Sequence, residues 1–259
     1  MAEWTRDQVL IALNLYCQLP FGRLHYRNPE IIEIAAKLGR TPGSLAMKLT
    51  NLASLDPVIV ESGRKGLSGA SALDRRVWQE FHENPEQVGY ESQVLMDALV
   101  DGSKSLHDLA SEADELDIPS SYSAETTTAT VKVRVKQSFF RRAVLSSYDS
   151  TCCMSGIKHP SLLVASHIVP WSKDEHNRLN PANGLCLSAL HDKAFDRGLL
   201  TVMPDLRIRV SSVLYDTEDE SMAKSYLIGL DGEKIKLPRK FSPDRDFLQY
   251  HNEKIFFGT

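Results

Sequence analysis

Two histidines and an asparagine in the second half of the chain have side chains suited to acid-base chemistry, metal binding and hydrogen bonding. They are His167, Asn183 and His191. A histidine can act as a general base because the pKa of its ring lies near neutral pH. A second histidine can hold a divalent metal ion through a neutral ring nitrogen, and such an ion polarises a phosphate and stabilises the leaving oxygen. Brought together, side chains of these types would allow metal-assisted hydrolysis.

The segments around these three residues predict a strand, a loop, a return strand and a helix. An apolar run over residues 162–169, interrupted by the first histidine and the serine before it, ends at a proline. A polar segment leads to an Asn-Gly turn, which is typical of the entry to a return strand, here residues 184–187. Ser188 then caps a helix that ends at Gly198. This order of elements can bring the two histidines and the asparagine within reach of one another.

The same stretch resembles the HNH, or ββα-metal, endonuclease family. The resemblance rests on the order of the three residues within ASHIVPW and NPANGLCLSALHDKAFDRGLLTV. It is closest to the bacterial branch found in restriction-type endonucleases, in which a YxxxCxxTG turn precedes the first histidine. Here that turn runs from Tyr148 to Gly156, with Ser155 in place of the threonine. The resemblance covers about residues 130–259.

The resemblance implies a role for each of the three residues. His167 is expected to be the general base and His191 a ligand of a divalent ion, with Mg²⁺ or Mn²⁺ as the expected cofactor. In such motifs the asparagine, here Asn183, either pins the loop by hydrogen bonds or helps to order the metal shell. We favour the loop-pinning role.

One position departs from the family pattern and leaves the second metal ligand open. Many members carry Asp or His immediately before the first histidine, where this chain has Ser166. Asp196, just over one helical turn beyond the second histidine, is a candidate ligand, as is Asp192. The cysteine pairs that hold zinc in some relatives are absent, so we expect Cys152 and Cys186 to pack in the core.

The first part of the chain predicts a helical domain over residues 1–110. Residues 4–18 and the segments that begin at Asn28 and Thr41 each carry a capping residue before an apolar pattern. The tight turn between the last two segments resembles a helix-turn-helix, with a possible winged-helix character. Its second helix is expected to present Lys48 to a DNA phosphate and Asn51 to a base edge. A plain helical hairpin packed in a core is the alternative.

A polar, Ser/Thr-rich stretch over residues 111–130 predicts a linker to a nuclease domain over residues 131–259. Valines alternate with basic residues over 131–136, which predicts a short strand, and a helix is expected over 137–148. Residues 128–215 hold twelve Lys or Arg residues against six Asp or Glu residues, which permits polyanion binding. Arg141 and Arg178 are candidate phosphate contacts. The fold class is therefore α+β, with a helical domain and a ββα-metal nuclease domain.

The sequence thus predicts a metal-dependent DNA endonuclease of restriction type, and dependence on base modification is a further hypothesis. Two alternatives stay open: a non-catalytic DNA-binding regulator with a decayed nuclease fold, and a defence nuclease gated by an effector. A homodimer is expected if both strands are cut, because palindromic DNA favours two-fold symmetry. No signal peptide or membrane-spanning run is evident, and the cysteines form no disulfide framework. We therefore expect a cytoplasmic protein without a membrane partner.

Overall fold

A computed structural model of the chain describes residues 3–63, 69–101, 124–216 and 225–258. It divides into two compact units, one of Met1–Ala143 with His176–Asn180, the other of Val144–Glu175 with Pro181–Thr259. The division falls inside a single long helix, α7 (Ala124–Ser147). Among the described residues, no helix combines the length and the apolar character needed to span a membrane.

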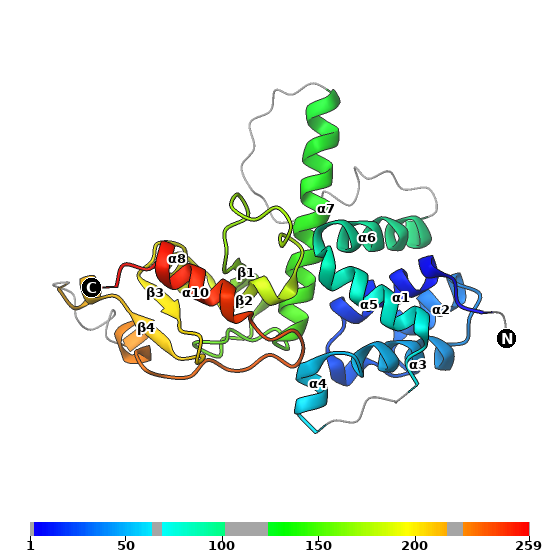
Figure 1. Ribbon diagram of the computed structural model, residues 1–259, viewed down its shortest axis with the longest axis horizontal. Helices are drawn as coiled ribbons and strands as arrows, with labels where there is room; N and C mark the ends of the chain where they lie inside the picture. Colours follow the sequence, from blue (N-terminus) through cyan, green and yellow to red (C-terminus); the bar gives the residue numbers. More distant parts are fainter. Residues whose placement is uncertain (1–2, 64–68, 102–123, 217–224, 259) are drawn as a thin grey trace. The chain divides into compact units, whose positions relative to one another are not determined.

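The first unit is built around α1 (Arg6–Gln18), whose residues from Val9 to Cys17 are all buried. This helix packs against α3, α5 and α6 (Figure 1). The remaining helices are α2 (Pro29–Lys37), α3 (Pro42–Ala53), α4 (Pro57–Glu61), α5 (Ala72–Glu83), α6 (Pro85–Asp101) and the first part of α7. The helical character predicted for the N-terminal part is therefore confirmed.

The predicted caps explain where three of these helices begin. Thr5 forms a capping box with Gln8 at the start of α1. The side chains of Asn28 and Thr41 accept backbone hydrogen bonds at the starts of α2 and α3, each followed by a proline in the first turn. These caps satisfy amide groups that a helix leaves without internal partners.

Helices α2 and α3 form the predicted helical pair. The prediction that α3 presents Lys48 and Asn51 to solvent is wrong. The side chain of Lys48 is only 7% exposed, and its Nζ lies 2.7 Å from Oδ1 of Asp74, which is fully buried on α5. Asn51 is buried as well. An isolated buried carboxylate is costly, so the lysine points inward to pair with it. No strand that could form a wing occurs in the described part of the first unit.

The predicted strand over residues 131–136 is wrong, because this segment belongs to α7. Of its three valines only Val135 is buried, and Val133 is 40% exposed. Val135, Phe139 and Ala143 are all buried at a spacing of four residues, which is the helical period. Of the predicted linker, residues 111–123 lie outside the described part of the chain, and residues 124–130 form the start of α7.

The described part of the second unit is built from two antiparallel strand pairs and the helices α8 and α10 that pack against them. β1 (Leu163–His167) pairs with β2 (Gly184–Ser188), and β3 (Leu200–Val202) pairs with β4 (Ile208–Val210). Helix α8 (Ala189–Asp196) follows β2 directly and packs against β1, β2 and β3. Helix α10 (Arg245–Lys254) packs against β3 (Figure 1). The predicted strand–loop–strand–helix order and the following hairpin are confirmed.

The loop between β1 and β2 is divided between the two units. Its residues His176–Asn180 belong to the first unit. Leu179 is fully buried there, and a Cβ placed on Gly89 of α6 would lie 3.1 Å from the Leu179 side chain and 3.2 Å from that of Phe139. The absence of a side chain at Gly89 therefore leaves room for close packing of the loop.

Candidate active site

Strand β1 places His167 at its last residue, opposite Gly184 at the first residue of β2. The imidazole is partly exposed and lies edge-on to the ring of Trp171, with 5.5 Å between the ring centroids. Within β1, Leu163 and Ser166 are buried, while Val164, Ala165 and His167 are partly exposed. The end of the strand thus holds a histidine that solvent can reach, at the point where the chain turns into the loop.

Asn183 fixes the backbone just beyond His167. Its side chain is fully buried. The amide Oδ1 accepts a hydrogen bond from the N–H of Val169 at 2.8 Å, and Nδ2 donates to the carbonyl oxygen of Val169 at 3.2 Å. Its own carbonyl oxygen accepts from the N–H of Ile168 at 2.9 Å. The side chain therefore takes the place of a backbone partner for Val169, which is the geometry that loop pinning requires.

His191, on the first turn of α8, is buried, and both of its ring nitrogens have partners. Nε2 lies 3.0 Å from the carbonyl oxygen of Tyr226. A carbonyl oxygen only accepts hydrogen bonds, so Nε2 is the nitrogen that carries a proton. Nδ1 lies 2.6 Å from Oγ of Ser188 and 3.8 Å from Sγ of Cys152. The ring thus ties α8 to two other parts of the second unit.

Sequence reasoning assigned Ser188 only as the cap of α8, and this part of the interpretation needs correction. Ser188 does occupy the N-cap position, but its side chain makes no capping hydrogen bond. The hydroxyl instead contacts Nδ1 of His191. The three-residue separation between the serine and the histidine was the available signal, because one helical turn brings these side chains to the same face.

The contact between Cys152 and His191 changes the pKa values of both side chains. Burial raises the pKa of the Cys152 thiol, but hydrogen bonds from His191 and Ser155 outweigh it and lower that pKa to about 6. Burial lowers the pKa of His191, but hydrogen bonds with Cys152 and with the Tyr226 carbonyl outweigh it and raise that pKa above its ordinary value. Both shifts favour a thiolate beside an imidazolium. The prediction that Cys152 and Cys186 are buried is confirmed.

The two candidate carboxylates lie one turn apart on α8. Burial raises the pKa of Asp192, and the nearby charge of Asp196 adds to that effect, while Ser166 and Lys193 oppose it. Burial likewise raises the pKa of Asp196, against the opposing charges of Lys193 and Arg197. Both carboxyl groups are therefore harder to ionise than usual.

The residues present do not fit a metal site as they stand. Within the part of the chain that the structure describes, no group of three His, Cys, Asp or Glu side chains converges to hold an ion. Both ring nitrogens of His191, the expected ligand, are engaged by protein atoms. No ligand set that joins His191 to Asp196 or Asp192 is therefore assembled.

Arg141 on α7 and Arg178 in the loop between β1 and β2 both belong to the first unit. Each is half-buried and has an interaction within the chain. Their assignment as phosphate contacts stays a prediction.

Strands β1 and β2 with helix α8 form a ββα unit that carries His167, Asn183 and His191 in chain order, which is the architecture of a ββα nuclease. Residues 152–203 match the HNH endonuclease family. This part of the chain is therefore an HNH endonuclease domain, and the resemblance to the HNH family is confirmed over these residues. No curated protein matches the chain.

Proposed function

We propose that this protein is a DNA endonuclease of restriction type, with His167 as the general base. The HNH family implies nuclease activity on nucleic acid. The observation that carries the finer proposal is the placement of His167 at the end of β1. Its imidazole is partly exposed, while the backbone that follows is held by Asn183.

In this mechanism a neutral ring nitrogen of His167 accepts the proton of a water molecule as that water attacks the phosphorus. Asn183 keeps the end of β1 and the start of the loop in one conformation, so the imidazole is oriented before the substrate arrives. Preorganisation of this kind lowers the entropic cost of reaching the transition state. HNH nucleases generally use a divalent metal ion, and we propose Mg²⁺ or Mn²⁺; no step is assigned to it because the described residues do not assemble its site.

The test is cleavage of plasmid DNA and of base-modified phage DNA by the full chain, in Mg²⁺, Mn²⁺ or EDTA. The His167→Ala variant is compared with His159→Ala, which removes an exposed loop histidine from the same unit. We expect metal-dependent cutting that falls by a factor on the order of 10²–10⁴ in the first variant and is unchanged in the second. Near-normal turnover by His167→Ala would remove this residue from the role of base.

A second candidate is a non-catalytic DNA-binding regulator that retains the nuclease fold. The engagement of both ring nitrogens of His191 favours it, because a histidine satisfied in this way has a structural role without any ion. DNA binding by the wild type, with no cutting of any substrate in any metal, would favour this regulator. Cutting that begins only when a small molecule or protein effector is added would identify a gated nuclease instead.

Cutting of both strands, if it occurs, would be explained by a homodimer with one site for each strand. Gel filtration with and without DNA tests this directly. A monomer that makes double-strand breaks in a single binding event would contradict it.

A further inference from the structure

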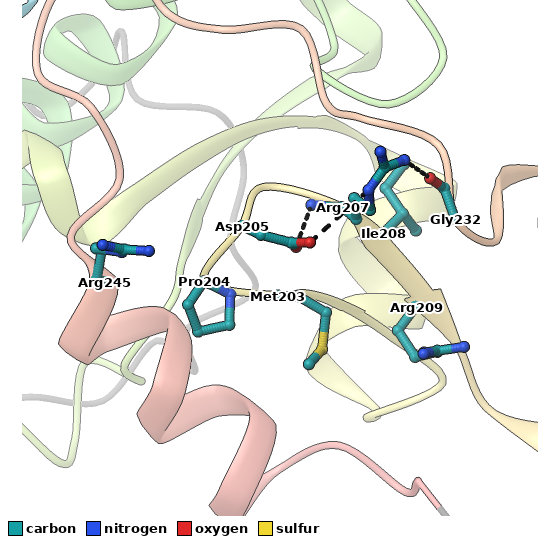
Figure 2. A pocket seen from close by; sticks show the side chains of 8 residues that line it. All are labelled: Met203, Pro204, Asp205, Arg207, Ile208, Arg209, Gly232 and Arg245. Atoms are coloured by element: carbon teal, nitrogen blue, oxygen red, sulfur yellow. Dashed lines mark hydrogen bonds and ion pairs between the residues drawn. The ribbon is translucent and has the colours of Figure 1, made fainter.

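The second unit contains a hollow of about 350 Å³ between the β3–β4 hairpin and the start of α10. Three arginines line it, Arg207, Arg209 and Arg245, together with one acidic residue, Asp205 (Figure 2). Its walls therefore carry more positive than negative charge. None of the lining residues has a role in the chemistry proposed for His167.

The pleat of β4 explains why two of the arginines share one face. Ile208 and Val210 point inward and are buried, while Arg209 between them is exposed. Arg207 precedes the strand in the same alternation, and the side chains of Arg207 and Arg209 are 51% and 59% exposed. Alternate residues of a strand lie on the same side. Arg245 comes from a different element, as the first residue of α10.

The contacts that these arginines make within the protein leave most of their donors available. Nε of Arg207 lies 3.7 Å from the Asp205 carboxylate, and Nη1 donates to the Gly232 carbonyl oxygen at 2.6 Å. Nη1 of Arg209 lies 3.8 Å from the Asp231 carboxylate. Exposed ion pairs at such distances stabilise a protein little. Within the described ranges, the Arg245 side chain has no hydrogen bond or ion pair at all.

The chemistry of the lining residues fits the backbone of a DNA strand. A guanidinium presents two parallel N–H groups that match two oxygens of a phosphate. Met203 and Pro204 add apolar surface beside the arginines (Figure 2), against which a deoxyribose can pack. We propose that Arg207, Arg209 and Arg245 bind backbone phosphates of the DNA substrate; this inference rests on the proposed function.

This site belongs to the same compact unit as His167. Helix α8 packs against β1 and β2 on one hairpin and against β3 on the other. Phosphates bound at the β3–β4 hairpin are thus held by the same unit that carries His167. Phosphate contacts of this kind set the position of the duplex without reading its sequence.

The test measures binding of the full chain to a fluorescein-labelled DNA duplex by anisotropy in EDTA, over a range of salt concentrations. The variants are Arg207→Gln, Arg209→Gln, Arg245→Gln and the triple variant. Arg239→Gln is the matched control, because Arg239 lies in the same unit, is 52% exposed and pairs with Asp149 at 3.2 Å. All four side chains are exposed, and circular dichroism verifies that the variants are folded.

Each lost contact should lower affinity about fivefold near 0.15 M salt, by the counterion-release relation, and reduce the slope of log affinity against log salt by about one. The triple variant should show the combined effect, and Arg239→Gln should bind like the wild type. A triple variant that binds as tightly as the wild type, or a control that weakens binding equally, would overturn the proposal. Binding that depends on the three arginines in a protein that cuts no DNA would support this site and refute the nuclease.

Discussion

Replacing Asn183 by alanine tests the idea that one buried amide holds the active-site loop. The substitution leaves the N–H and the carbonyl oxygen of Val169 without their side-chain partners, which lie at 2.8 and 3.2 Å in the structure. Val169 is itself buried, so water does not readily replace the lost bonds. A buried polar group without a partner costs about 1–3 kcal/mol. Because neighbouring effects are not fully additive, we expect a total loss of about 2–4 kcal/mol.

Native-state hydrogen exchange is the suitable assay because it reads the second unit separately from the first. A loss of about 2–4 kcal/mol corresponds to exchange of the core amides of β1 and β2 that is roughly 30 to 1,000 times faster. Gln249→Ala is the matched control, since it removes an exposed amide from α10 in the same unit. A surface change of this type should alter stability by less than about 0.5 kcal/mol.

Two results would refute this reasoning. Exchange rates in Asn183→Ala equal to those of the control would mean that the two hydrogen bonds do not stabilise the loop. Faster exchange with unchanged DNA cleavage would mean that the loop is stabilised but that its conformation does not position His167.

Three further perturbations follow from the structure. Lys48→Ala should destabilise the first unit by about 3–5 kcal/mol, because it leaves the buried Asp74 carboxylate unpaired, as measured by urea unfolding. Burial lowers the pKa of His251 to about 4. As the pH falls, this imidazole is therefore protonated in the unfolded chain at a higher pH than in the folded protein. The free energy of unfolding should therefore decrease between about pH 6.5 and 4, by on the order of 3 kcal/mol. Gly198→Ala should lower the thermal unfolding temperature markedly, because the φ of +69° disfavours a side chain and a Cβ would collide with the Ile255 carbonyl oxygen.

Each of these predictions has its own control. DNA affinity corrected for the folded fraction should be unchanged in Lys48→Ala, and a selective loss of affinity would restore a DNA-contact role. The change in the free energy of unfolding between pH 6.5 and 4 should be smaller in His251→Gln. An unchanged profile would mean that other groups cause this pH dependence. Gly232→Ala has a similar φ of +80° but open space around its Cβ, so it should be much milder than Gly198→Ala; equal effects would contradict the collision.

The parts of the fold that depend on neighbouring residues could be predicted from the sequence. The caps at Thr5, Asn28 and Thr41 satisfy amides within the next turn, so their signal is contained in a few residues. The apolar run with its one histidine likewise located β1. The Asn-Gly pair marked the start of β2, but the predicted turn is wrong, because Pro181–Asn183 form a 3-10 helix and Gly184 is already in the strand. The order of His167, Asn183 and His191 was enough to identify the nuclease family.

The parts that failed depend on partners far along the chain. The inward orientation of Lys48 is set by Asp74, which lies on a different helix. The alternating valines before Val135 fit a strand locally, but burial of Val135 with Phe139 favours the helix. The second partner of the His191 ring is a backbone carbonyl that carries no sequence signal at all.

The four cysteines can report local opening of the folded structure. None of the four is in a disulfide and all are buried, Cys17 in the first unit and Cys152, Cys153 and Cys186 in the second. A thiol reagent can modify such a residue only when the surrounding structure opens. The rate of modification, assigned to each cysteine by peptide mass spectrometry, therefore measures the opening free energy of each unit in the unmodified protein. One labelling experiment can thus show whether the helical unit and the nuclease unit open together or independently.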